Sequence, residues 1–500
     1  MDQLRVRILG IGTHLQPVVF LRADSSVCRS EGLATQTRVS LVYEGRELTA
    51  TLNIVTDHLV REGEIGLSDA AVNILAVKEG DIVVLQHASA VESLHHVRSK
   101  LYGHALGRQA MQDIVADVVA GHYSDIHLAA FVTACAGSRL DEREITYLTD
   151  AMVRSGRRLA WTHPQVVDKH CLGGLPGNRT TPIVVAIVAA CGLIMPKSSS
   201  RAITSPAGTA DTIETMMPVQ LTTAHMQSVV EAEGACMVWG GAVSLSPADD
   251  LLIRVERALD LDSEGQMVAS VLSKKIAAGS THVLIDIPVG PTAKVRSHAQ
   301  ADRLGGILCH VGEALGLHVR IHISDGSQPV GRGIGPALEA HDVLAVLRRQ
   351  GDAPDDLKQR SLDLAAVILE MGGAAESGQG RKRALHTLES GQALEKFMAI
   401  AQAQGGFHEP PVAGFHHDIL AQRDGVVAYM NNRFLSRLAK LAGAPADAAA
   451  GLSMHVRLGE RVSRGDVMLT VHAQAQGQLD YALQFFNQHP HEVRVEGEFV

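Results

Sequence analysis

The chain has 500 residues, of which 46% are hydrophobic, and it carries a formal net charge of −9. This length allows roughly two to four domains with stable cores. The acidic balance argues against a nucleic-acid partner, because binding to nucleic acid relies on clustered cations. The six cysteines include no C-x-x-C pair, which is typical of free thiols in a reducing cytoplasm.

Targeting and metal signals are absent from the sequence. Arg5 and Arg7 interrupt any apolar signal-peptide core, and the longest apolar stretch, residues 182–196, is too short to cross a bilayer. The 25 histidines form neither an H-E-x-x-H motif nor a Cys/His quartet. We therefore expect a cytoplasmic protein that contacts no membrane and holds no metal.

Residues 1–87 carry the pattern of a small β-rich, barrel-like domain. Glu44-Gly45-Arg46 is predicted to be a hairpin turn. Alternating and β-branched residues predict strands at 5–11, 18–22, 38–43, 47–55 and 81–85. From residue 88 to 163 the periodicity becomes helical, with a helix predicted over 109–120. Ser124 and Asp141 are the predicted caps of the next two helices.

Residues 164–410 alternate strand and helix signals, which is typical of an α/β layer with a largely parallel sheet. Ligands bind beyond the carboxyl ends of the strands in such sheets. The segment Gly331–Gly335 lacks the spacing of a dinucleotide fingerprint and is predicted to be a loop near that site. Strands are predicted at 283–289 and 319–323, and helices at 301–315 and 336–349.

A glycine- and proline-rich linker at residues 405–411 precedes a second β-rich segment. Strands are predicted at 425–429, 455–458 and 467–471, with glycines at the turns. The pattern resembles the barrel-sandwich hybrid of lipoyl and biotinyl carriers. No lysine follows Lys440, so an attachment site is lacking and only the fold is expected here.

Two polar, glycine-rich clusters flank the apolar run 182–196. In the first, Asp168, Lys169 and His170 end a predicted strand and are followed by a turn that contains Gly173, Gly174 and Gly177. The second gathers cations and hydroxyls before another predicted helix: Lys197, Ser198, Ser199, Ser200, Arg201, Thr204, Ser205 and Thr209. Backbone N–H groups, lysines and hydroxyls at such turns suit a phosphate, whereas simple helix capping needs fewer cations.

These clusters carry a family resemblance. Residues 168–174, D-K-H-C-L-G-G, resemble the D-K-H-S-T-G-G signature of thymidine and pyrimidine-nucleoside phosphorylases, and residues 270–275 resemble their S-x-x-x-K-K helix. The likeness is closer to the AMP phosphorylase branch, with D-K-H-C-x-G-G-x-P-G-N-R-T-T at 168–181 and S-S-R-A-I-T-S-P-A-G-T-A-D at 199–211. It extends over most of the chain, including a segment before residue 90 that thymidine phosphorylases lack.

The resemblance implies a multidomain α/β and α+β architecture. The expected parts are an N-terminal β-rich assembly domain (1–87), a helical domain (88–163, with about 245–280), an α/β phosphate- and nucleotide-binding domain (164–410) and a C-terminal barrel-sandwich-like domain (411–500). A homodimer through the helical domain is implied, with higher assembly through residues 1–87. No cofactor is implied, because orthophosphate is a co-substrate.

The resemblance also assigns site residues. Asp262 matches the proton donor of AMP phosphorylases; without the resemblance, a solvated acid near a helix start is the alternative interpretation. Phosphate-binding positions match Lys169, Thr180, Ser199 and Thr209, while Cys171 replaces a phosphate-binding serine. Nucleotide-binding positions match Gly174, Ser200, Arg201, Ala202, Ile203, Thr204, Ser205, Thr209, Ser270 and Lys294.

The spacing and the chemistry of individual residues add three expectations about the site. Ser270 and Lys274 are one helical turn apart and share a face. His170 is expected to contact sugar or base, or to make a structural hydrogen bond. Positive charge for a nucleotide 5′-phosphate is expected from Arg201, Lys197 and Lys294.

The alternative reaction is thymidine phosphorolysis. Counting back from Ser270 places Val255 where thymidine phosphorylases carry a base-binding arginine, and helical geometry turns Arg254 and Arg257 away from that position. Weak or absent activity on thymidine is therefore expected. Anthranilate-type phosphoribosyltransferases share the general architecture, but the first loop offers only Asp168 for their Mg²⁺. A nucleotide-binding regulator without activity is the remaining hypothesis.

Overall fold

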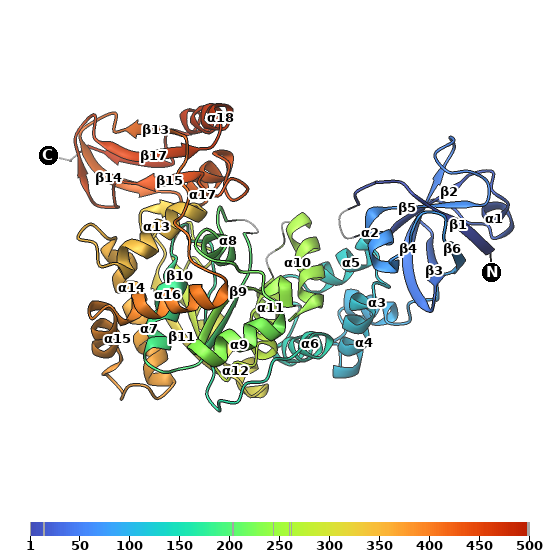
Figure 1. Cartoon of the computed structure of the whole chain (residues 1–500), viewed down its shortest axis with the longest axis horizontal. Helices are drawn as coiled ribbons and strands as arrows, with labels where there is room; N and C mark the ends of the chain where they lie inside the picture. The colour runs from blue at the N-terminus through green and yellow to red at the C-terminus, as the bar shows by residue number, and fades with distance from the viewer. Residues whose placement is uncertain are drawn as a thin grey trace. The chain divides into compact units, whose positions relative to one another are not determined.

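The computed structural model describes residues 2–13, 16–202, 205–243, 245–259, 261 and 263–497. It contains two compact units, one made of Met1–Arg139 with Leu251–Leu261 and the other of Leu140–Asp250 with Asp262–Val500 (Figure 1). No helix among these described residues is both long enough and apolar enough to cross a membrane. The domain boundaries inferred from the sequence stay a prediction.

The first unit begins with a closed barrel in the strand order β1-β5-β2-β4-β3-β6. Its strands are β1 (Asp2–Ile8), β2 (Val18–Arg22), β3 (Arg38–Tyr43), β4 (Arg46–Val55), β5 (Glu64–Leu67) and β6 (Ile82–His87). Two short helices accompany them, α1 (Ser26–Ser30) and α2 (Asp69–Leu75). The hairpin predicted at Glu44-Gly45-Arg46 joins the antiparallel strands β3 and β4, and the buried side chains Leu21, Leu41 and Leu52 fill the barrel.

Two details of the barrel differ from the sequence-based expectation. The first strand ends at Ile8 rather than residue 11, because Gly10 adopts a left-handed φ of 63° that strand residues do not use. The strand β5 was not predicted. It has only four residues and contains a glycine, so it carries little alternating pattern.

The helical part of the first unit contains α3 (Leu94–Leu101), α4 (Arg108–Val119) and α5 (Asp125–Cys135). The predicted cap Ser124 accepts a hydrogen bond from His127 N, so α5 begins where expected. Helix α10 (Pro247–Leu259) begins in the second unit and ends in the first. Arg254 on α10 donates to Asp125 of α5 at 2.6 Å.

The second unit is built on parallel strands. Strands β7 (Val167–Cys171), β10 (His282–Val289) and β11 (His318–Asp325) form one sheet in the order β11-β10-β7. Strands β8 (Met195–Ser199) and β9 (Ala235–Trp239) form a second parallel pair. A parallel bridge between Val166 and Ile194 joins β7 to β8, so the carboxyl ends of these strands face the same edge. The predicted α/β domain is confirmed.

Helices cover both faces of this sheet. Helix α7 (Thr180–Ala190) is apolar on all sides and lies in the main core with Leu284, as expected of a fully buried helix. The opposite face, with Val319 and Ile321, packs against α12 (His298–Ala314). The other helices of the second unit before its C-terminal part are α6 (Glu142–Ser155), α8 (Thr209–Glu214), α9 (Thr223–Glu233), the 3-10 turn Gly240–Val243, α11 (Glu264–Ala277), α13 (Pro336–Leu347), α14 (Asp355–Met371), α15 (Gly380–Glu389) and α16 (Gln392–Gln404). Asp141 caps α6 as predicted and accepts from Glu144 N at 2.8 Å.

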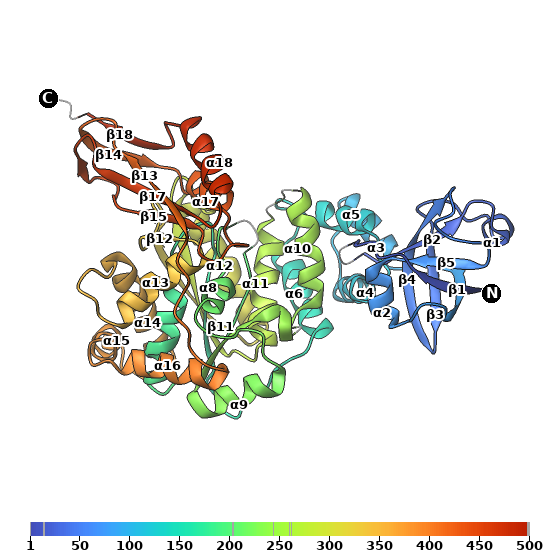
Figure 2. The same ribbon diagram turned by 45° about the horizontal axis from the view of Figure 1, so that its top comes forward.

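The C-terminal part of the second unit has two sheets, one with β13 (Phe415–Leu420), β15 (Gly451–Met454), β17 (Val467–Ala473) and β12 (Gly333–Ile334), the other with β14 (Gly425–Met430), β16 (Arg461–Val462) and β18 (Val493–Glu496). Helices α17 (Asn432–Leu441) and α18 (Gln476–Asn487) pack on their core. Both views place the first sheet beside α13 (Figures 1 and 2). The assignment to a barrel-sandwich hybrid stays a prediction.

Two sequence-based expectations are corrected in this region. Gly331–Gly335 is not entirely loop, because β12 within it pairs with β15 through partners 120 residues away along the chain. The strand predicted at 455–458 lies after β15, which ends at Met454. Both errors have the same cause, since strands of two to four residues are defined by their distant partners and not by local alternation.

Candidate active site

The two polar clusters meet at the carboxyl edge of the parallel strands. The first begins at Asp168 within β7 and continues through the turn into α7, and the second begins at Lys197 within β8 and continues through the next loop into α8. Arg179 Nη1 donates to Thr209 Oγ1 at 2.7 Å and so connects the two loops directly. Predicted phosphate-binding residues from separate strands are therefore neighbours, at the edge where such sheets bind ligands.

Close backbone approaches shape the first loop. Gly177 has φ +68°, and a Cβ atom there would lie 2.2 Å from the carbonyl oxygen of Val330, so only glycine fits. Gly174 has φ +80°, with the backbone N of Lys294 3.0 Å from its Cβ position. The predicted nucleotide-binding residues Gly174 and Lys294 are thus in contact, and the segment after Val330 lies beside the loop as expected.

Lys169 of β7 and Thr180, the first residue of α7, lie on either side of the first loop. The Lys169 side chain is 1% exposed, and its Nζ donates to Thr180 Oγ1 at 2.5 Å. Burial lowers the pKa of Lys169, although the charge of Asp286 acts in the opposite direction. Burial also raises the pKa of the Cys171 thiol to about 12, so this residue is a neutral thiol at pH 7.

A buried carboxylate organises three elements beneath this loop. Asp168 is fully buried and pairs with Lys197 Nζ of β8 at 3.2 Å and with Lys275 Nζ of α11 at 2.7 Å. Burial by itself would raise the pKa of Asp168, but the two ammonium groups outweigh it and the pKa lies below its usual range. The Lys197 ammonium points into the protein, which leaves it no exposed charge for a substrate 5′-phosphate.

His170, which follows Lys169 in β7, is half-buried. Burial, followed by the charge of Lys275, holds the pKa of His170 well below its usual range. The imidazole is therefore neutral at pH 7 and can donate one hydrogen bond and accept another.

The second loop is held by an ion-pair network. Arg201 donates to Glu214 Oε1 at 2.8 Å and pairs with Asp211 Oδ1 at 3.1 Å, and its guanidinium lies 5.0 Å from the centre of the Trp239 ring. Asp211 also accepts from the backbone N of Ala202 at 2.7 Å. Arg201 therefore orders the loop through protein partners, which compete with a substrate phosphate for its N–H groups.

The other predicted residues of this loop differ in their placement. Ser199 is half-buried and Ser200 is exposed, while Ser205 Oγ donates to Ala207 O at 2.9 Å. Ile203 and Thr204 lie outside the described residues.

Arg179 and Glu339 are residues that sequence reasoning missed. Arg179 Nε donates to Glu339 Oε2 of α13 at 2.6 Å, and Nη2 donates to Ala207 O at 3.1 Å. Burial raises the pKa of Glu339 to about 7, which Arg179 partly opposes. Arg179 was recognisable as a member of the 168–181 motif, but no local signal pointed to Glu339, 160 residues further along the chain.

Helix α11 brings the predicted pair Ser270 and Lys274 together. Lys274 Nζ donates to Ser270 Oγ at 3.1 Å and pairs with the buried Asp249 at 2.6 Å. Ser270 and Lys274 thus share one face of α11, as their spacing predicts. Asp262, the predicted proton donor, lies outside the described residues.

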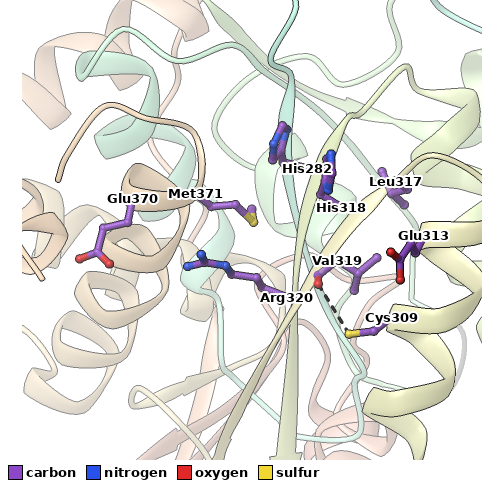
Figure 3. Close-up of a pocket in the computed structure, with 9 residues that line it drawn as sticks. All are labelled: His282, Cys309, Glu313, Leu317, His318, Val319, Arg320, Glu370 and Met371. Atoms are coloured by element: carbon purple, nitrogen blue, oxygen red, sulfur yellow. Dashed lines mark hydrogen bonds between the residues drawn. The ribbon is translucent and has the colours of Figure 1, made fainter. Parts of the chain in front are cut away.

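A cavity of about 380 Å³ lies at the opposite, amino edge of the sheet. Figure 3 shows its lining side chains divided between the two sides of β11, with Arg320 and Glu370 on one side and Cys309 and Glu313 on the other. Among the residues that the structure describes, no three His, Cys, Asp or Glu side chains are grouped to hold a metal ion. The two polar clusters at the carboxyl edge, joined by the bond from Arg179 to Thr209, are the candidate active site.

Comparison with protein families gives three matches along the chain. Residues 94–156 match the helical bundle domain of a glycosyl transferase family, and residues 163–394 match the a/b domain of the same family. Residues 426–489 match the pyrimidine nucleoside phosphorylase C-terminal domain. In solved structures, anthranilate phosphoribosyltransferase from Thermus thermophilus is similar in fold, with a TM-score of 0.51 and 18% identity over 62% of this chain and 98% of that one.

Full-length relatives are much closer. A protein of Hahella chejuensis named "Putative thymidine phosphorylase" is 57% identical over 100% of this chain and 99% of its own length. A protein of Polaromonas sp. with the same name is 58% identical over 97% of this chain and 94% of its own length. The chain therefore belongs to the thymidine and pyrimidine-nucleoside phosphorylase family and is an enzyme of the pentosyltransferase class.

Proposed function

We propose that the protein cleaves the N-glycosidic bond of a nucleoside 5′-monophosphate with orthophosphate, and that AMP is its substrate. The products are then adenine and ribose 1,5-bisphosphate. Two contacts at the carboxyl edge of the sheet support phosphorolysis. Lys169 donates to Thr180, and Arg179, the residue before Thr180, donates to Thr209 of the second loop. The choice of AMP rests on the sequence of both loops, 168–181 and 199–211.

In this reaction phosphate is held by Lys169, Thr180, Ser199 and Thr209 beside C1′ of the ribose. The bond from C1′ to the base nitrogen breaks while a phosphate oxygen bonds to C1′, and the base takes the bonding electron pair. Asp262 delivers a proton to N7 of adenine, so the base leaves neutral. Ser270 and Lys274 are proposed to orient the base from one face of α11.

The alternative is thymidine phosphorolysis, which is favoured by the names of the relatives. Two observations weigh against it. Val255 occupies the position of a base-binding arginine and is buried. The neighbouring Arg254 is already paired with Asp125 at 2.6 Å.

A substrate panel tests the proposal. Release of free base from AMP, CMP, UMP, GMP, adenosine, uridine and thymidine is followed by chromatography, with and without phosphate and with EDTA as a control for Mg²⁺. We expect phosphate-dependent adenine release from AMP that EDTA does not reduce. Release from thymidine but not from AMP would replace the proposed substrate, and a requirement for Mg²⁺ and pyrophosphate would favour phosphoribosyl transfer.

Asp262→Asn is expected to lower kcat by about 10²- to 10⁴-fold, because an amide cannot supply the proton that the base needs. The matched control is Asp302→Asn, at an exposed position of α12, which should leave kcat at the wild-type value. Circular dichroism confirms that both variants are folded. Wild-type turnover in Asp262→Asn would remove this residue from the mechanism.

A further inference from the structure

We propose that Arg179 and Glu339 are positioning residues of the phosphate site, which hold the Thr209 hydroxyl as a hydrogen-bond donor to phosphate and connect it to the C-terminal fold. The proposal rests on the phosphate site described above. It concerns residues that neither the family matches nor the loop motif assigns a role.

The Arg179 guanidinium joins three separate segments. It donates to Thr209 Oγ1 at 2.7 Å, to Glu339 Oε2 at 2.6 Å and to Ala207 O at 3.1 Å. A guanidinium presents its N–H groups in a rigid plane. The bonds from Nε to Glu339 and from Nη2 to Ala207 O hold this plane in place. The direction of the Nη1 group, which donates to Thr209, is therefore fixed as well.

The bond to Thr209 determines what its hydroxyl can offer. A threonine hydroxyl has one hydrogen to donate and lone pairs to accept. Since Thr209 Oγ1 accepts from Arg179, its hydrogen is directed away from the guanidinium and is available to an anion. Thr180 is in the same state, because its Oγ1 accepts from Lys169 Nζ at 2.5 Å. Each threonine of the site is thus oriented as a donor by a cation behind it.

Glu339 holds the guanidinium in place. Its carboxylate is 1% exposed and also accepts from Thr212 Oγ1 at 3.1 Å and from the backbone N of Gly335 at 3.3 Å. A buried guanidinium without a counter-charge is costly. Loss of the carboxylate charge should therefore let Arg179 shift and release its bond to Thr209.

The segment that carries Glu339 is anchored in the C-terminal fold. Immediately before α13, Ile334 of β12 pairs with Leu452 of β15, and Ala337 N donates to Ala448 O at 2.9 Å. A Cβ atom at Gly335 would lie 2.3 Å from Ala450 O, so the two segments touch closely (Figure 2). The C-terminal sheet thereby supports the phosphate site without contributing a residue to it.

The test uses Arg179→Lys and Glu339→Gln in the full chain. Arg179→Lys keeps the charge but loses the planar donor set, and Glu339→Gln keeps the shape but loses the charge. We expect each to raise the KM for phosphate by about 10- to 100-fold, the equivalent of one hydrogen bond to a charged group. The KM for nucleotide should rise by a smaller factor, because Thr209 is also a predicted nucleotide-binding position. Controls of the same substitution type are Arg464→Lys, in the turn after β16, and Glu395→Gln, in α16, both at exposed positions.

A double-variant cycle separates positioning from general stability. In the Thr209→Val background, Arg179→Lys should have little further effect on phosphate KM, because the hydroxyl it orients is gone. An equal effect in both backgrounds, or an unchanged phosphate KM in both Arg179→Lys and Glu339→Gln, would overturn the proposal.

Calorimetric titration with inorganic phosphate gives a second readout. A wild-type protein that binds phosphate but releases no base would contradict the proposed function alone.

Discussion

Replacing Lys169 by glutamine is expected to lower phosphate-dependent base release by about 10²- to 10³-fold. Lys169 is a buried cation of β7 beside the first loop, and its Nζ donates to Thr180 at 2.5 Å. A glutamine amide can still donate to Thr180, so the loop should keep its shape. The amide brings no charge to the incoming phosphate, however, and charge-assisted hydrogen bonds are about twice as strong as neutral ones.

The measurement is kcat and phosphate KM, with base release followed by chromatography. Lys382→Gln, an identical change at an exposed position of α15, should leave both values unchanged. Thermal unfolding of both variants shows whether the loop change has affected the fold. Near-wild-type phosphorolysis by folded Lys169→Gln would mean that the phosphate is bound elsewhere.

Local motifs were sufficient to predict the strand, turn and helix that carry the first polar cluster. The residues of 168–181 act within one strand–turn–helix unit, where glycines, a lysine and hydroxyls follow each other closely. Periodicity was likewise sufficient for long elements such as α12 and β10, whose apolar residues repeat over several turns or pleats. For these elements, local pattern and tertiary packing favour the same structure.

The partners of the site residues could not be predicted in this way. Lys275 pairs with Asp168 across more than 100 residues of sequence, and Glu339 reaches Arg179 across 160. Which group each lysine contacts depends on how strands and helices come together. The sequence analysis predicts that Lys169 binds orthophosphate and that Lys197 binds a 5′-phosphate. Both lysines are buried, but Lys197 pairs with Asp168, whereas Lys169 contacts the predicted phosphate-binding residue Thr180.

The Asp168 cluster leads to the largest expected effect on stability. Asp168 is the carboxylate between Lys197 and Lys275, and all three side chains are buried. Asp168→Asn removes the negative charge and leaves Lys197 and Lys275 buried without a counter-ion. Burial already lowers the pKa of Lys275 to about 7, and loss of the carboxylate lowers it further, so Lys275 is expected to lose its proton. Removing one partner of a buried ion pair costs about 3–5 kcal/mol, and we expect a loss of free energy of unfolding in this range.

The free energy of unfolding is measured by urea unfolding followed through tryptophan fluorescence. The chain has two tryptophans, Trp161 and Trp239, and both belong to the second unit. The signal therefore reports on the unit that contains Asp168. Asp302→Asn serves again as the exposed control. Lys275→Met should cost less than Asp168→Asn, because Asp168 keeps Lys197 at 3.2 Å. In the Lys275→Met background the cost of Asp168→Asn should then fall by about 0.5–3 kcal/mol, the usual coupling of residues in contact. Equal costs in the two backgrounds would show that the two lysines do not share the carboxylate.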